Sequence, residues 1–195
     1  MKYYAVKKGF KPGIYTSWDD CKKQVMNYSG AVYKSFGTRE AALAFMEQKP
    51  PRIVKAEVVS YVDGSFNLST GTYGYGGVLI KDNQLIKKFK GQGTNSDYAS
   101  MRNVAGEILG SLKAIEYAIK HGYKSIAIYY DYEGIEKWAD KLWQARKPGT
   151  IEYVEKIDNY RKKIDVIFVK VAAHSGDYYN EMVDKLAKEA VGINE

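Results

Sequence analysis

Four widely spaced acidic residues stand where a purely structural role explains them poorly: Asp63, Glu107, Asp131 and Asp184. Asp63 and Asp131 each close an apolar run that is typical of a buried strand, although strand propensity disfavours Asp. Glu107 lies inside an apolar stretch of helical periodicity, and Asp184 lies in the last such stretch. Carboxylates that converge on one point repel each other, and bound cations relieve that repulsion. Ligands that are all oxygen favour Mg²⁺ or Mn²⁺ over zinc.

Each acid taken singly also has an ordinary structural explanation. Asp63 and Asp131 could cap strand ends, and Glu107 and Asp184 could lie on solvated helix faces. Spacing along the chain does not by itself bring the four together. The metal site is therefore a hypothesis that depends on how the surrounding elements fold.

The elements that must position these acids follow from the residue pattern after residue 56. Strands are predicted at 57–63, 72–80, 84–90, 125–130 and 165–171, and helices at 99–120, 133–145, 151–163 and 178–191. Three strands therefore come first, and helices alternate with strands afterwards. This order predicts an α/β domain whose mixed sheet begins with antiparallel strands and is flanked by helices.

A smaller α+β unit is predicted ahead of that domain. Strands are expected at 3–6 and 31–36, and helices are expected to begin near Ser17 and Thr38. Pro50 and Pro51 end the second helix and favour an extended connection. The expected organisation is a domain at 1–47, a linker at 48–56 and a second domain at 57–195.

Composition narrows the class of protein. The 195 residues carry a formal net charge of +7, and the first fifty hold nine Lys and Arg against four Asp and Glu. A polyanion is the natural partner of such a surface, although some soluble proteins are basic without one. One cysteine and two histidines exclude an internal disulfide and a structural zinc site. No apolar run is long enough to span a membrane, and we expect a cytoplasmic monomer without a membrane partner.

Five motifs in residues 57–195 occur in a characteristic order: YVDGSF at 61–66, RNVAGE at 102–107, YDYEGI at 130–135, VAAHSGD at 171–177 and NEMVD at 180–184. In order and spacing they resemble type 1 ribonuclease H. The resemblance implies a mixed five-stranded sheet whose first three strands are antiparallel. It also implies metal-dependent endonucleolytic hydrolysis of the RNA strand of RNA–DNA hybrids, leaving 5′-phosphate and 3′-hydroxyl ends.

The same resemblance implies roles for individual residues. The four acids would hold two Mg²⁺ ions, with Mn²⁺ as the alternative, and His174 would assist water activation or product release. Apart from the resemblance, Glu181 precedes Asp184 by three residues, so the two could share a helix face and Glu181 could support Asp184; a solvated helix face is the equal alternative for Glu181. Contacts to the hybrid fall on Gly64, Ser65, Asn103, Glu107 and Trp138. The segment of Trp138, Lys141, Trp143, Arg146 and Lys147 suits DNA contact, although the spacing of its tryptophans fits core packing equally well.

Two residues depart from the family pattern. Val104 stands where many relatives have a second amide, and Glu133 stands where many have Gln. A carboxylate cannot donate a hydrogen bond as an amide does. Contacts to the minor groove are therefore expected to be weaker or differently made, while the four acids are intact.

Residues 2–46 resemble a second family. PGIY at 12–15, SW at 17–18, CKKQV at 21–25 and YKSF at 33–36 match the hybrid-binding, viroplasmin-like domain that precedes many type 1 ribonucleases H. The resemblance implies that Trp18 and Tyr33 pack on deoxyriboses, that Lys34 contacts a DNA phosphate, and that Tyr4 is a further contact. Double-stranded RNA is a second candidate ligand. Alternatively, Trp18 and Tyr33 belong to a shared aromatic core.

Two other functions remain open on sequence alone. One is a different nuclease or strand transferase of the ribonuclease H-like superfamily, which cutting of duplex DNA would reveal. The other is a hybrid-binding protein without catalysis, which binding without metal-dependent cleavage would reveal. The presence of all four acids favours the enzyme.

Overall fold

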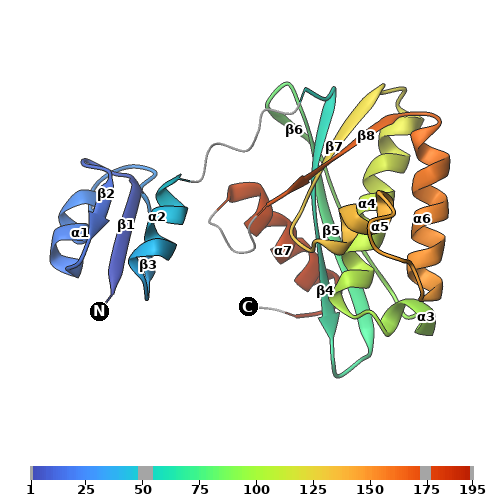
Figure 1. Cartoon of the computed structure of the whole chain (residues 1–195), viewed down its shortest axis with the longest axis horizontal. Coiled ribbons are helices and arrows are strands. Elements are labelled where there is room, and N and C mark those ends of the chain that lie inside the picture. The colour runs from blue at the N-terminus through green and yellow to red at the C-terminus, as the bar shows by residue number, and fades with distance from the viewer. Residues whose placement is uncertain (1, 48–54, 172–176, 194–195) are drawn as a thin grey trace. The chain divides into compact units, whose positions relative to one another are not determined.

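The computed structural model of the chain describes residues 2–47, 55–171 and 177–193. The chain divides into two compact units, Met1–Ile53 and Val54–Glu195 (Figure 1). Most of the expected linker, residues 48–54, lies outside the described residues. No helix in the described part of the chain combines the length and the apolar character needed to cross a membrane.

The first unit is a three-stranded antiparallel sheet with two helices. Its strands are β1 (Tyr3–Lys8), β2 (Gly13–Tyr15) and β3 (Val32–Phe36), in the order β2-β1-β3, and its helices are α1 (Trp18–Val25) and α2 (Arg39–Glu47). The short strand β2 was not predicted. Only three residues belong to it, which is too few for an alternating pattern to be recognised.

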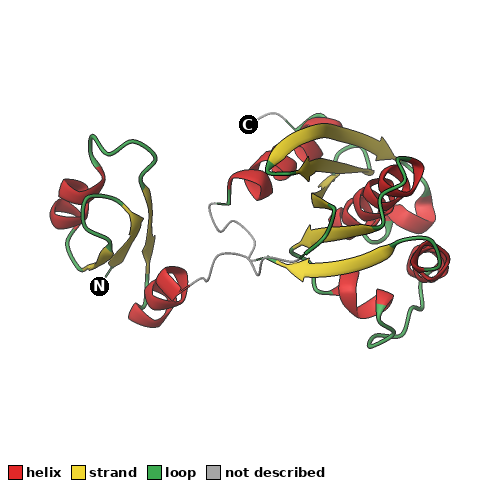
Figure 2. Cartoon of the chain, turned by 90° about the horizontal axis from the view of Figure 1, so that it is seen from above, coloured by secondary structure: helices red, strands yellow, loops and turns green. Residues whose placement is uncertain are grey.

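The alternation of side chains along β1 explains how one strand serves both helices. Val6 packs with Cys21 and Val25 of α1, whereas Ala5 packs with Ala42 and Phe45 of α2. Successive residues of a strand point to opposite faces, so each face of the sheet buries one helix. Figure 2 shows the two helices on either side of this small sheet.

The second unit is built on a five-stranded mixed sheet. The strands are β4 (Val58–Asn67), β5 (Thr72–Lys81), β6 (Gln84–Gly93), β7 (Ser125–Tyr130) and β8 (Asp165–Lys170). Their order is β6-β5-β4-β7-β8, with antiparallel pairing among β4, β5 and β6 and parallel pairing from β4 through β7 to β8. This arrangement confirms the predicted mixed sheet with an antiparallel start.

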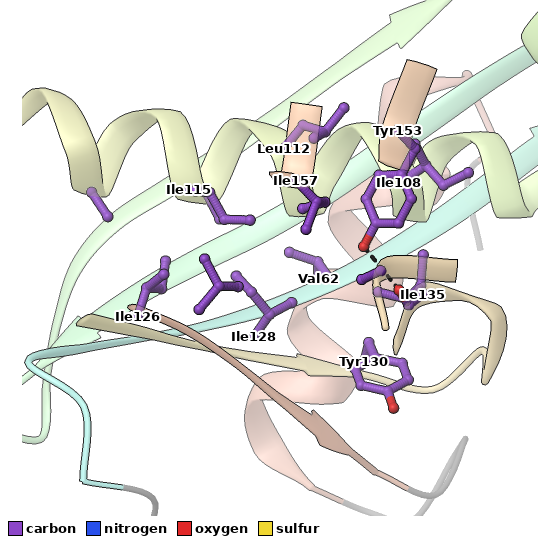
Figure 3. Close-up of a cluster of buried hydrophobic side chains, with 14 of the residues drawn as sticks. Val62, Ile108, Leu112, Ile115, Ile126, Ile128, Tyr130, Ile135, Tyr153 and Ile157 are labelled. Carbon is purple, nitrogen blue, oxygen red and sulfur yellow. Dashed lines mark hydrogen bonds between the residues drawn. The ribbon is translucent and has the colours of Figure 1, made fainter. Parts of the chain in front are cut away.

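Five helices accompany this sheet: α3 (Ser96–Ala99), α4 (Asn103–Lys120), α5 (Gly134–Ala139), α6 (Pro148–Arg161) and α7 (Tyr178–Ala190). In α4, Ile108, Leu112 and Ile115 recur at helical spacing, and all three are buried. Figure 3 shows them packed with Ile126 and Ile128 of β7. Val183 of α7 belongs instead to a second cluster with Tyr61 and Tyr129.

The structure corrects three predicted element boundaries. The helix expected at 99–120 begins only at Asn103, and Ala99 belongs instead to the short helix α3, because Arg102 adopts a left-handed φ of 55° between α3 and α4. The helix expected at 133–145 is only α5, which ends at Ala139, and Lys141 has a φ of 59° just beyond it. Strand β4, expected to end at Asp63, continues to Asn67, so Asp63 lies inside the strand rather than at its end.

Candidate active site

The sheet register places Asp63 and Asp131 at the same level. The parallel strands β4 and β7 pair Tyr61 with Tyr129, and each acid lies two residues further along its own chain. β7 ends at Tyr130, so Asp131 leaves the sheet beside β4. The backbone N–H of Gly64 donates a 2.7 Å hydrogen bond to Oδ1 of Asp63. The two carboxylates, both half-buried, therefore lie at the same level of the sheet, one in β4 and the other directly after its neighbour β7.

Glu107 reaches the same place from helix α4. Its side chain is only 2% exposed, and its Oε1 accepts hydrogen bonds from the backbone N–H groups of Asp131, at 3.0 Å, and Tyr132, at 3.2 Å. A buried carboxylate needs such partners, because burial without them is costly. The carboxylate thus connects the first turns of α4 to the chain that leaves β7.

Two glycines let α4 approach the sheet closely enough for this contact. A Cβ on Gly106 would lie 1.8 Å from the backbone oxygen of Gly74, and a Cβ on Gly64 would lie 2.0 Å from that of Asn103. Neither position has room for a side chain. The glycine beside Glu107 therefore serves the contact between helix and sheet.

Asp184 comes from helix α7. Lys188, one turn later, forms an ion pair with it at 3.0 Å, and both side chains are about a quarter exposed. Glu181, one turn before Asp184, is exposed. The negative charge of Asp184 contributes to raising the pKa of Asp63. Asp184 therefore belongs electrostatically to the same group of acids.

Burial and mutual repulsion disfavour the charged forms of these acids. Burial, the charge of Asp131 and the charge of Asp184 together raise the pKa of Asp63 to about 7, against the opposing hydrogen bond from Gly64 and the charge of Lys188. Burial, then Asp131 and Asp63, raise the pKa of Glu107 well above its usual range, against the hydrogen bonds from Tyr132 and Asp131. The charge of Lys188 therefore offsets only part of the repulsion among these carboxylates.

The donor set suits a hard divalent cation. All four side chains offer oxygen only, and a cation would offset the repulsion that raises the pKa of Asp63 and Glu107. Among the residues that the structure describes, no three acidic, His or Cys side chains are already arranged to hold a metal ion. Asp63, Glu107, Asp131 and Asp184 are the residues that could bind one.

A groove lies beside the first turn of α4. Its volume is about 320 Å³, and the residues on its wall that matter here are Arg102, Asn103, Trp138, Gln144, Arg146 and Lys147. Asn103 is exposed, whereas Trp138 is half-buried and packs against the main core. The centroids of Trp138 and Trp143 are 6.0 Å apart in a T-shaped contact. Core packing of Trp138 is therefore observed, and its contact with DNA stays a prediction.

An exposed aromatic strip lies on the α1 side of the first unit. Trp18 and Tyr33 are 42% and 45% exposed, and their ring centroids are 5.9 Å apart. The ring centroid of Tyr4 lies 5.6 Å from that of Trp18. The two rings contact each other, yet nearly half of each remains open to a ligand. Lys34 is exposed on the opposite face of β3 from Tyr33.

Comparisons with known protein families identify the family to which the chain belongs. The family described as Ribonuclease H1 N-terminal domain matches residues 2–46, and the family described as RNase H matches residues 55–192. The chain belongs to the ribonuclease H family. The family matches confirm both resemblances inferred from sequence, that of the five motifs in the second unit and that of the separate motifs in residues 2–46.

Curated relatives named Ribonuclease H cover different parts of the chain. The one from Pseudoalteromonas translucida is 31% identical over 141 residues, covering 68% of this chain and 88% of the relative. The one from Wolbachia pipientis wMel is 26% identical and covers 70% and 97%. The one from Saccharomyces cerevisiae is 50% identical over 46 residues, which are 24% of this chain and only 13% of the yeast protein.

Solved structures share the fold of the second unit. Ribonuclease H1 from Halobacterium salinarum NRC-1 has a TM-score of 0.58 at 22% identity, covering 69% of this chain and 96% of that one. LC11-RNase H1 in a complex with an RNA/DNA hybrid has a TM-score of 0.56 at 16% identity, covering 69% and 99%. At such identities the likeness establishes the fold alone.

The remaining ribonuclease H positions predicted from sequence divide into three groups. His174 lies outside the described residues. Gly64 and Ser65 are half-buried on β4, close to Asp63. Of the two departures from the family pattern, Val104 lines the groove, and Glu133 forms an ion pair with Lys137 at 2.8 Å.

Sequence reasoning missed two residues that the structure draws into the ribonuclease H site region. Arg102 and Gln144 line the groove beside Asn103, but they come from irregular segments, where no periodic pattern distinguishes them. The helix predicted at 99–120 includes Arg102 as an interior residue. The only available signal was its position directly before Asn103 in the RNVAGE motif.

Proposed function

We propose that this ribonuclease H hydrolyses the RNA strand of RNA–DNA hybrids with two divalent ions, leaving 5′-phosphate and 3′-hydroxyl ends. The observation that carries the proposal is the buried Glu107 carboxylate, held by the backbone of Asp131 and coupled to the charges of Asp63 and Asp131. Maintaining such repulsion costs stability, so a function that needs the charge is its best explanation.

Asp63, Glu107, Asp131 and Asp184 would hold the ions, with Mg²⁺ the expected metal and Mn²⁺ the alternative. When bound, the ions would supply the Lewis acidity that activates water and stabilises the leaving 3′ oxygen. The chain itself supplies position. Backbone N–H groups fix Glu107, and Gly64 and Lys188 orient Asp63 and Asp184. His174 is proposed to move a proton or to help release the product.

We propose that different residues of the second unit contact the RNA strand and the DNA strand of the hybrid. Gly64, Ser65, Asn103 and Glu107 would read the 2′-hydroxyl of the RNA strand, the group that distinguishes RNA from DNA. The groove beside Asn103 would take the DNA strand, with Arg146 and Lys147 near its phosphates and Trp138 against a sugar. The exposure of Asn103 and the basic wall of the groove support this division.

The first unit is proposed to hold the substrate. Trp18 and Tyr33 would pack on deoxyriboses, with Tyr4 beside them and Lys34 at a DNA phosphate; double-stranded RNA is the alternative ligand. The exposed halves of the two rings support this role. Tethering to the catalytic unit would raise the local substrate concentration. Removal of residues 1–50 should then raise the Michaelis constant and reduce processivity without abolishing cleavage.

One experiment separates the candidate functions. Wild type, Asp131→Asn and a control, Asp165→Asn, are incubated with a uniform hybrid, single-stranded RNA and double-stranded DNA, with Mg²⁺ or EDTA. Asp165 is exposed at the start of β8, so its substitution should leave activity unchanged. We expect Mg²⁺-dependent cutting of the hybrid's RNA strand alone, lost in Asp131→Asn. Cutting of DNA would indicate another superfamily branch, and hybrid binding without cleavage would indicate a binding protein.

A further inference from the structure

A column of aromatic rings lies at the C-terminal end of α4, with a lysine at each end of the column. The rings of Tyr117 and His121 are stacked with centroids 3.8 Å apart, and those of His121 and Tyr123 with centroids 6.5 Å apart. Lys87 of β6 lies 5.6 Å from the Tyr117 ring, and Lys81 of β5 lies 5.2 Å from the Tyr123 ring. We call these five residues the ring column.

A hollow adjoins the ring column between β6 and α4. Its volume is about 160 Å³, and it is lined by Tyr75, Lys87, Phe89, Lys90, Lys113 and Tyr117. Lys87 and Tyr117 belong to both the hollow and the column. β6 is an edge strand of the sheet, so no further strand among the described residues covers it. The column and hollow therefore form one continuous surface.

This surface carries more lysines than carboxylates that pair with them. Lys90 and Lys113, on the wall of the hollow, pair with Glu189 and Glu116. In contrast, Lys81, Lys87 and Lys120 form no ion pair with any carboxylate in the described part of the chain. Lys81 ends β5, Lys87 lies in β6, and Lys120 ends α4 directly before His121 of the column. Such a surface attracts an anion.

The surface is separate from the proposed catalytic site. Glu107 lies in the second turn of α4, whereas His121 directly follows its last residue. Fourteen residues of helix correspond to about 21 Å along the axis. None of the residues of the ring column or hollow belongs to the four acids, the groove or the aromatic strip of the first unit.

We propose that the ring column and hollow bind single-stranded nucleic acid. Unpaired bases bind by stacking on aromatic side chains while nearby lysines contact their phosphates. Here a base would stack on the outer face of Tyr117 or Tyr123 after the lysine over that ring, Lys87 or Lys81, turns to a phosphate. A duplex keeps its bases stacked inside and offers no free base faces, so it fits this surface less well. The site would hold a single-stranded segment next to a hybrid, a function additional to cleavage and independent of it.

Binding is measured with the full chain in EDTA, which prevents metal-dependent cleavage. An unlabelled hybrid is added to saturation to occupy the other proposed sites, and a fluorescent oligothymidylate is titrated over a range of salt. The variant Lys81→Gln with Lys87→Gln is compared with Lys162→Gln with Lys163→Gln. The control lysines are exposed just before β8, at the opposite edge of the sheet.

Loss of two phosphate contacts should flatten the salt dependence. The slope of log affinity against log salt should decrease by about 1.4 in the first double variant, at about 0.7 per contact to a single strand. The control pair should keep the wild-type slope. Both variants should cleave a blunt hybrid at the wild-type rate. Equal slopes in wild type and both variants would overturn the proposal.

A second comparison tests stacking. Tyr117→Leu should weaken binding of the oligothymidylate about fivefold or more, while leaving an abasic oligonucleotide of equal length unaffected. Equal loss for both oligonucleotides would show that the ring takes no base and would overturn the proposal. Binding of a fluorescent glutamate-rich peptide, lost in the variant Lys81→Gln with Lys87→Gln, together with no binding of the oligothymidylate, would overturn the proposal and assign the surface to an acidic protein partner.

Discussion

The Glu107 carboxylate accepts a hydrogen bond from the backbone N–H of Asp131, at 3.0 Å. Glu107, one proposed metal ligand, therefore holds the backbone of Asp131, another proposed ligand. The second hydrogen bond, from Tyr132, reinforces this position and makes the turn after β7 depend on α4. The positions of both acids, and the repulsion between them, therefore depend on the contact between α4 and the chain that follows β7.

Replacement of Glu107 by Gln should separate the effect of its hydrogen bonds from the effect of its negative charge. The amide oxygen of Gln can still accept both backbone hydrogen bonds, while the negative charge is lost. Hydrolysis of a hybrid should decrease about a thousandfold, since metal-ion stabilisation of the transition state is worth several kcal/mol. Glu116→Gln on the same helix is the control and should retain activity, because Glu116 pairs with Lys113 and Tyr160 instead. Full activity in Glu107→Gln would contradict the proposed metal site.

The charge of Asp63 should make the metal-free protein less stable at alkaline pH. The pKa of Asp63 is raised to about 7 when folded, against about 3.9 when unfolded. Stability from this group is therefore fully present below about pH 4 and is lost as the pH rises through 7. In EDTA at pH 8, Asp63→Asn should be more stable than wild type by roughly 2 kcal/mol, and the difference should shrink toward pH 5.

Chemical denaturation of both proteins in EDTA across this pH range gives the measurement. Asn keeps the oxygen that accepts the Gly64 hydrogen bond, so the charge is the main change. Saturating Mg²⁺ should stabilise wild type more than the variant. A variant that is less stable than wild type at every pH would show that Asp63 is not under repulsion.

The aromatic strip of the first unit should govern affinity rather than chemistry. Trp18→Ala and Tyr33→Ala should each raise the Kd for a hybrid about tenfold, as expected from the loss of a stacking contact, with kcat unchanged. Phe10→Ala is the matched control, because Phe10 is 64% exposed in the same unit but packs on Tyr28. A decrease in kcat with unchanged Kd would argue against this division of labour.

Adding one methyl group at Gly106 should test the close approach of helix and sheet. Its Cβ would meet the backbone oxygen of Gly74 at 1.8 Å, and a backbone atom cannot move aside cheaply. Gly106→Ala should therefore destabilise the protein by about 1–3 kcal/mol. At Gly110, one turn later, the nearest atom is Val62 Cβ at 3.4 Å, an ordinary contact. Gly110→Ala should be neutral or stabilising by up to about 1 kcal/mol, as thermal denaturation would show.

Much of the fold could be predicted because burial leaves a periodic pattern. The β-rich runs of β1, β4 and β5 and the helical spacing in α4 predict those elements, and the order of strands and helices along the chain predicts a mixed sheet with an antiparallel start. The four acids could be singled out because they interrupt such patterns. Their assignment to a metal site depended on the motif resemblance, since no local pattern reports which distant residues meet.

Sequence alone determined the order of the elements, the family and the candidate acids, because residue type and spacing are local properties. Tertiary structure decided that Glu107 is buried against the backbone of Asp131, that Arg102 breaks a helix, and that Asp63 lies inside β4. It also assembled the ring column from α4, β5 and β6. These features depend on contacts between elements far apart in the chain, where packing and register outweigh local propensity.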